Sequence, residues 1–99
     1  MLTMHPGEYI SEAYLEPLDM SHTELASRLD VSVSTISRII NGKADVTPSM
    51  AVRLSRVLGR SPESWMAMQA AYSLAEAETT VDVSKLKPTT ARSLAAQHA

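Results

Sequence analysis

SHTELASRLDVSVSTISRIINGK, residues 21–43, is the stretch that decides the fold of this chain. Ser21, followed three residues later by Glu24, predicts a capping box at the start of one helix. Ser32 predicts the start of a second helix, and Gly42 predicts its end. Two short helices joined by a tight turn have the proportions of a helix-turn-helix.

The residues between these signals support the same unit. Ala26 is small at the point where the helices, expected over 22–29 and 33–41, would cross. Asp30 ends the first helix, where the chain needs a left-handed residue that Asp tolerates. The apolar side chains that would fix the crossing angle are Leu25, Leu29, Val31, Ile36 and Ile39.

The second helix has an outer face suited to a DNA groove. Ser34 and Arg38 point away from the apolar side, which is formed by Val33, Ile36, Ile39 and Ile40. An Arg can bond guanine in a bidentate manner, and short hydroxyls can bond bases or phosphates. The alternative is a solvent-facing helix rich in Ser and Thr, which form helices poorly. We expect contacts at the bases of the groove from Ser32, Val33, Ser34, Thr35, Ser37 and Arg38. We expect contacts with phosphates from Asn41, Lys43 and His22.

Similar signals occur on both sides of this unit. Pro6 opens a helix that reaches Leu15 and is closed by Pro17, and two further helices are expected over 48–58 and 63–75. Five short helices predict an all-α fold. We assign a helix-turn-helix domain to residues 1–78. Residues 79–99 are a tail, in which the alternation from Thr79 to Val83 also suits a short strand.

Composition narrows the function. The chain has 99 residues, no Cys and a net charge of −2. Residues 1–27 carry five acids and no Lys or Arg, whereas residues 28–60 carry six basic and two acidic residues. The net charge of −2 argues against a general polyanion binder. The distribution of the charges along the chain nevertheless leaves one basic surface for DNA and one acidic surface for a basic protein. The sequence contains no catalytic motif, membrane span, metal site or cofactor site, and we expect a cytoplasmic protein that is not an enzyme.

Three longer pieces resemble a known family. ELASRLDVSVSTISRIINGK resembles the xenobiotic-response-element (XRE) helix-turn-helix of bacterial and phage repressors. HPGEYISEAYLEPLDMS and VTPSMAVRLSRVLGRSPESWMAMQAAYSL resemble HigA-type antitoxins within that family. Asp30 departs from the usual turn glycine, and His22 stands where many members have Gln.

The resemblance implies a five-helix, lambda-repressor-like domain with a short C-terminal extension. It also implies a homodimeric antitoxin that represses its own operon and neutralises a RelE-like, mRNA-cleaving toxin, and that lies on the nucleoid when bound to operator DNA. A stand-alone XRE-type repressor without a toxin is the alternative. A protein that binds a toxin and scarcely touches DNA is a third interpretation.

Two further groups have both a structural and a functional interpretation. The side chains expected on one side of the last helix suit a core, or alternatively a dimer interface: Trp65, Met68, Gln69 and Tyr72. Glu8 and Glu12 suit a solvated acidic stripe, or alternatively a surface for a basic toxin. Arg53, Arg56 and Arg60 are expected on one helix, where they can hold phosphates or pair with acids.

Overall fold

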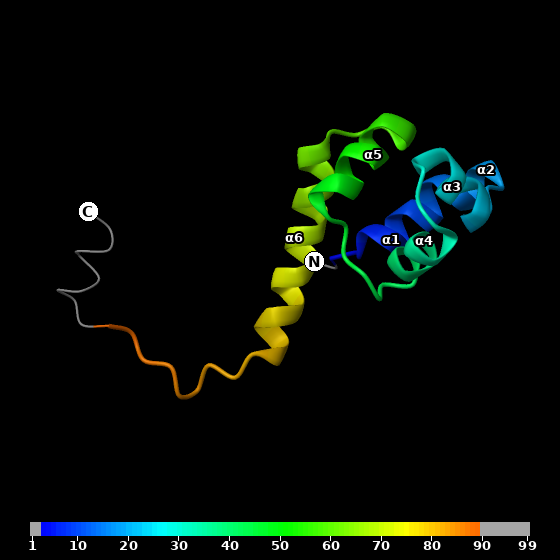
Figure 1. Cartoon of the computed structure of the whole chain (residues 1–99). Coiled ribbons are helices and arrows are strands. Elements are labelled where there is room, and N and C mark those ends of the chain that lie inside the picture. The colour runs from blue at the N-terminus through cyan, green and yellow to red at the C-terminus, as the bar shows by residue number, and fades with distance from the viewer. Residues whose placement is uncertain (1–2, 90–99) are drawn as a thin grey trace.

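The computed structural model describes residues 3–89, which contain five helical segments and no strand (Figure 1). The first segment is continuous and combines α1 (Pro6–Ile10), the π-helical η1 (Ser11–Leu15) and α2 (Glu16–Leu18). The others are α3 (His22–Leu29), α4 (Val33–Ile40), α5 (Pro48–Leu58) and α6 (Pro62–Thr80). The predicted all-α fold with five helices is confirmed.

His5 caps the first segment, since its Nδ1 accepts the Gly7 N–H, and hydroxyl side chains cap the other four. In each case the hydroxyl of the cap accepts the backbone N–H of the residue three positions later. The caps are Ser21 for α3, Ser32 for α4, Thr47 for α5 and Ser61 for α6. Because each cap satisfies a donor that the helix leaves unpaired, these four starting points could be predicted from the sequence.

The first segment corrects one expectation. Pro17 does not close the helix, which continues to Leu18 and ends at Asp19 in the left-handed conformation, with φ 51°. The turn before Pro17 is wider than an α-helical turn, since the Glu16 N–H bonds the Ser11 carbonyl. A wider turn accommodates a proline ring that would otherwise strike the carbonyl four residues earlier.

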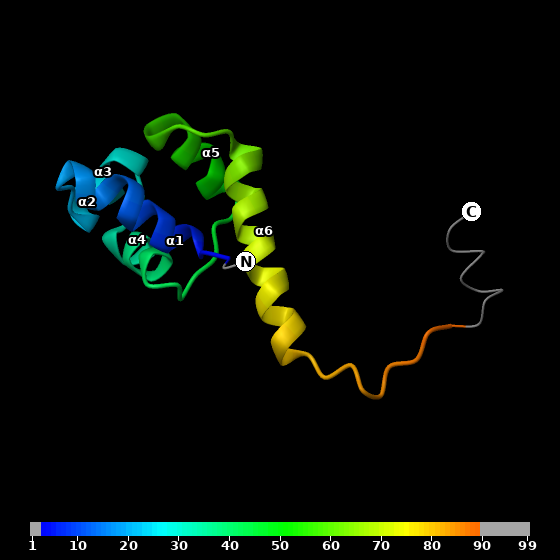
Figure 2. The ribbon, with the colours of Figure 1, turned by 180° about the vertical axis from the view of Figure 1, so that it is seen from behind.

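The last helix also differs from expectation. α6 ends at Thr80, five residues beyond the predicted end, and residues 81–83 form no strand. The added part includes Ala75, Glu76, Ala77 and Glu78, which are strong helix formers. Figure 2 shows this part of α6 extending past the other helices. Of the predicted tail 79–99, residues 90–99 lie outside the described part of the chain.

The core lies where α1, α3, α4 and α5 meet the first half of α6. Its buried apolar side chains are Ile10, Leu15, Leu25, Ala26, Leu29, Ile36, Ile39, Val46, Met50, Ala51, Leu54 and Trp65. Gly7 allows α1 to lie directly on the end of α4, because a Cβ at this position would be 1.9 Å from the Ile39 carbonyl oxygen. The orientation of α4 therefore depends on its contact with the N-terminal helix.

Candidate nucleic-acid interface

The turn between α3 and α4 is built as the sequence predicts. Asp30 is in the left-handed conformation, with φ 57° and ψ 48°, and the next N–H, that of Val31, bonds the Ala26 carbonyl. Ala26 is fully buried, which agrees with a close crossing of the two helices. The Arg53 guanidinium, from α5, donates to the carbonyl oxygens of Leu29 and Asp30 at 2.7 and 3.2 Å. It thereby satisfies carbonyls that the helix end leaves unpaired.

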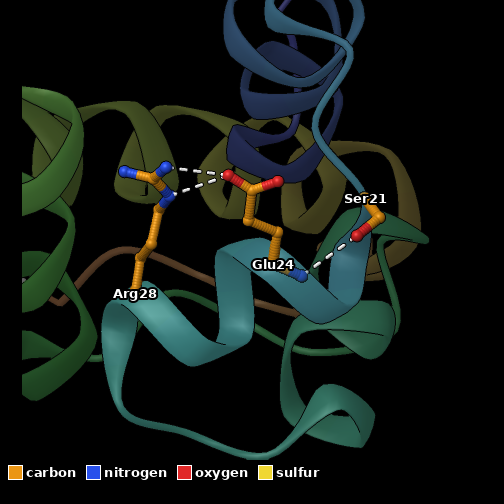
Figure 3. A network of polar contacts seen from close by, with 3 residues as sticks. All are labelled: Ser21, Glu24 and Arg28. Carbon is orange, nitrogen blue, oxygen red and sulfur yellow. Dashed lines mark hydrogen bonds and ion pairs between the residues drawn. The ribbon is translucent and has the colours of Figure 1, made fainter.

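The cap of α3 is half of the expected capping box. The Ser21 hydroxyl accepts the Glu24 N–H, as expected, but the Glu24 carboxylate points to Arg28 (Figure 3). The Arg28 guanidinium donates to one carboxylate oxygen at 2.8 and 3.1 Å. Arg28 therefore adds little free positive charge to this side of the molecule.

The outward face of α4 is exposed and polar. Ser34, Thr35 and Arg38 lie in solvent, while Ile36 and Ile39 are buried. We expected Val33 on the apolar side of this helix, and this expectation is wrong. Val33 lies in the first turn of α4 and is 41% exposed. An exposed valine beside hydroxyls and an Arg can contact a thymine methyl group in a major groove.

Local hydrogen bonds order the polar side chains of α4. Thr35 and Ser32 share a hydrogen bond of 2.8 Å between their hydroxyls, at the N-terminus of α4. The Arg38 guanidinium donates to the Lys43 carbonyl at 3.3 Å. Nδ1 of His22 lies 3.1 Å from the Ser37 hydroxyl and so joins α3 to α4. His22 and Ser37 are half-buried, and Nε2 is the imidazole nitrogen that this bond leaves available for a phosphate.

A hollow of about 250 Å³ lies beside the outward face of α4. Polar groups line its walls together with apolar groups from the core. The lining residues are Ser34, Thr35, Arg38, Ile39, Ala44, Asp45, Thr47 and Met50. The residues after α4 therefore form a second wall of the surface that α4 presents.

The basic residues of the middle third divide into two groups. Arg53 holds the turn, and Arg60 lies over the Tyr9 ring, 5.0 Å from its centroid, with a bond to the Tyr9 hydroxyl. We expected Arg60 to lie on the same helix as Arg53 and Arg56. Instead, α5 ends at Leu58, and Arg60 follows it with φ 64°. The exposed basic residues that remain are Arg38, Lys43 and Arg56, of which two lie at α4.

The aromatic stripe of α6 belongs mainly to the core of the single chain. Trp65 has no exposed surface, and its indole N–H donates to the Gly59 carbonyl. Gln69 is 5% exposed and bonds the chain after α4. These two side chains leave no surface for a second copy, which corrects their assignment to a dimer interface. Met68 and Tyr72 are half-buried, and Tyr72 lies edge-on to the His5 ring.

The acidic residues of the first helix lie at the surface. Glu8 and Glu12 are both exposed, so their carboxylates are available to solvent or to a basic protein partner. Within residues 3–89 no group of His, Asp or Glu could hold a metal ion. In the same residues no helix is both long and apolar enough to cross a membrane.

Known proteins share the sequence and the geometry described above. The profile of the helix-turn-helix family matches residues 12–65, more than half of the chain. An uncharacterised HTH-type transcriptional regulator of Escherichia coli K12, YddM, is 50% identical over 82 residues, covering 83% of this chain and 86% of YddM. The chain belongs to the helix-turn-helix family.

Solved structures define the branch of this helix-turn-helix family. A Pseudomonas aeruginosa protein in complex with an 18-bp operator DNA has a TM-score of 0.80 at 33% identity, over 90% of this chain and 99% of its own. The P. aeruginosa antitoxin HigA, solved with the higBA promoter, has a TM-score of 0.76 at 30% identity, over 90% and 100%. The resemblance to HigA-type XRE proteins is confirmed. The chain is an XRE-type DNA-binding regulator.

Sequence patterns did not reveal three residues that position this surface. The sequence patterns place Gly7 in a motif and Gln69 in a stripe, and they leave the use of the Arg53 cation open. Their partners lie 23 to 32 positions away in the sequence. The spacing of side chains within one helix carries no signal for contacts of this length.

Proposed function

We propose that this chain is the antitoxin of a type II toxin–antitoxin pair. As a homodimer it represses its own operon, and it neutralises a RelE-like, mRNA-cleaving toxin. The likeness to HigA, whose structure was solved with the higBA promoter, supports this proposal. The observation that carries it is the outward face of α4, which combines exposure, short hydroxyls and a single Arg. In this proposal the protein acts in the cytoplasm, at the nucleoid when operator DNA is bound.

The residues of α4 divide into two roles on the operator. We assign Ser34, Thr35 and Arg38 to the base edges of the major groove, since they are the most outward polar groups of the helix. Ser32, Val33 and Ser37 flank that contact. Three residues around the helix then hold phosphates and set its register on the duplex: His22, Asn41 and Lys43.

A dimer requires a surface other than the buried stripe of α6. We propose the apolar groove between α5 and α6, which has a volume of about 530 Å³. Its lining residues are Pro48, Ala51, Val52, Pro62, Glu63, Met66, Ala67 and Ala70. Val52 is 53% exposed in the single chain, although a valine gains by burial. A helix-turn-helix protein that reads two half-sites needs two copies in fixed orientation.

Changing Val52 tests this arrangement. We expect Val52→Glu to yield a folded monomer in sedimentation experiments, because the new carboxylate would be buried against a second copy. A V52E protein that remains a dimer would exclude this groove as the dimer surface.

The acidic first helix is the proposed surface for a basic toxin. Glu8 and Glu12 are exposed, and residues 1–27 carry no compensating Lys or Arg. Opposite charges on two partners increase the rate of encounter and select the orientation of binding. Reversal of both residues to Lys is expected to weaken toxin capture and increase its dependence on salt concentration, and unchanged capture would exclude this surface.

A stand-alone repressor without a toxin is the second candidate. The similarity to YddM favours it, since that relative is described only as a transcriptional regulator. The two functions separate in one experiment, in which the chain is co-expressed with the neighbouring reading frame. Co-purification of a basic partner and a gel shift of the shared promoter support the antitoxin. A gel shift without a partner supports the stand-alone repressor, and a partner without a gel shift supports a protein that only binds a toxin.

A further inference from the structure

Gln69, on α6, makes hydrogen bonds to the residues that follow α4. We call residues 41–47, which connect α4 to α5, the α4–α5 segment. Oε1 of Gln69 accepts the backbone N–H of Val46 at 2.8 Å, in a buried position. Nε2 of Gln69 donates to the Asp45 carboxylate at 3.3 Å and to the Ser73 hydroxyl at 3.1 Å.

These bonds fix the orientation of the Gln69 amide. The Val46 N–H can only donate, so the oxygen of the amide must face it, and the NH₂ group must then face Asp45 and Ser73. Gln69 is 5% exposed and its side chain is therefore held without competition from bulk water. A buried, fully bonded amide of this kind is rigid.

The α4–α5 segment forms part of the surface proposed for DNA. Asn41 and Lys43 are its proposed phosphate contacts, and both are exposed. Ala44, Asp45 and Thr47 form one wall of the hollow whose other wall is α4. Close to α4 the segment is held by backbone bonds, of which the last runs from the Lys43 N–H to the Arg38 carbonyl. Beyond this point, Gln69 supplies the side-chain bonds at Asp45 and Val46.

We infer that Gln69 is a positioning residue for operator recognition. It holds the α4–α5 segment at a fixed distance from α4 and so places Lys43 on its phosphate and fixes the width of the hollow. This inference rests on the proposed operator binding by α4. It gives Gln69, four positions after Trp65, a role in DNA recognition, although its side chain is buried and cannot touch DNA.

The test compares Gln69→Met with wild type in operator titrations at several salt concentrations. Met preserves the size and burial of the side chain but leaves the Val46 N–H without its acceptor. We expect the folded Q69M protein to bind the promoter at least tenfold more weakly, with a salt slope lower by about 0.9, the value for one lost phosphate contact. Combining Q69M with Lys43→Ala is expected to give less than the sum of the two effects, because both act on the same contact.

A matched control is Ser73→Ala, which removes the third partner of Gln69 without touching the α4–α5 segment. Operator affinity and salt slope of S73A are expected to equal those of wild type. Circular dichroism at the assay temperature verifies the folded state of each variant. If Q69M does not fold, Gln69→Glu takes its place, since it retains the acceptor for Val46 and replaces the donor to Asp45 with a carboxylate that repels it. We expect Q69E to bind about two- to fivefold more weakly than wild type.

The outcomes separate this inference from the proposed function. Wild-type protein that fails to shift the promoter contradicts operator binding itself. If wild type binds, and the folded Gln69 variant binds with the same affinity and the same salt slope, Gln69 serves stability alone and the inference is wrong.

Discussion

Helices α4 and α6 use their polar side chains in opposite ways. The outward side chains of α4 lie in solvent and bond within a few positions, as Thr35 does with the cap Ser32 and Arg38 with Lys43. Ser37, whose hydroxyl lies near His22, is the half-buried exception. On α6, Gln69 is buried and reaches partners 23 and 24 positions away. Side chains that recognise a ligand must remain available to it, whereas side chains that hold a scaffold are used inside it. We therefore expect changes at buried positions of α6 to lower stability, with Gln69 also acting on binding through the α4–α5 segment, and changes on the outward face of α4 to affect binding.

The largest expected effect is that of Trp65→Ala. Trp65 is fully buried and bonds the Gly59 carbonyl, so its removal leaves a cavity and an unpaired acceptor. We expect a loss of roughly 3–5 kcal/mol in the free energy of unfolding, measured by urea denaturation. The control is Leu74→Ala on the same helix, because Leu74 is 63% exposed. Equal effects of W65A and L74A would contradict a scaffold role for this side of α6.

Gly7→Ala tests how the scaffold orients α4. Alanine forms helices better than glycine, so propensity alone predicts a more stable protein. The new Cβ would instead strike the Ile39 carbonyl, and we expect a loss of about 1–3 kcal/mol in thermal denaturation. Gly42→Ala is the comparison, since Gly42 has open space but a φ of 73°, and its cost arises from backbone conformation alone. A stabilised G7A protein would show that α1 and α4 do not pack as closely as described.

Lys43→Ala tests a contact proposed for the DNA side. Lys43 is exposed, so the free energy of unfolding is expected to change by less than about 0.5 kcal/mol. The salt slope of operator binding is expected to fall by about 0.9, equally for specific and unrelated sequences. A loss that depends on the DNA sequence would instead assign Lys43 to base recognition.

Asp30→Gly has the smallest expected effect on DNA binding. Asp30 is left-handed, a conformation that glycine adopts without the Cβ contact, so D30G is expected to gain at most about 1 kcal/mol in stability. The bond from Arg53 uses the Asp30 carbonyl and is retained. Operator affinity is expected to be unchanged, and a destabilised D30G would indicate that the Asp30 side chain itself supports the turn.

The two helices also show how far the sequence predicts this molecule. Caps, turns and the apolar spacing of α4 are local signals. They correctly predicted the capping roles of Ser21 and Ser32, the left-handed conformation of Asp30 and the exposure of Arg38. Pro17 was misjudged because a π-helical turn widens the backbone before it, which a local rule for proline does not anticipate. The stripe of α6 could be recognised from spacing, but the packing of α5 and of the first helical segment against α6 decided that Trp65 is buried and used by the core. Contacts such as Gln69 with Val46 arise only when the chain has folded.

Operator binding by the Ser34→Ala/Arg38→Ala double variant tests the central claim most directly. Both residues are exposed on α4, so the variant should have the wild-type melting temperature. We predict that wild type shifts its own promoter fragment at low salt. The double variant should lose specific binding, to which the R38A change alone should contribute about 1–3 kcal/mol. A folded double variant that binds the promoter as tightly and as specifically as wild type would contradict DNA recognition by the outward face of α4.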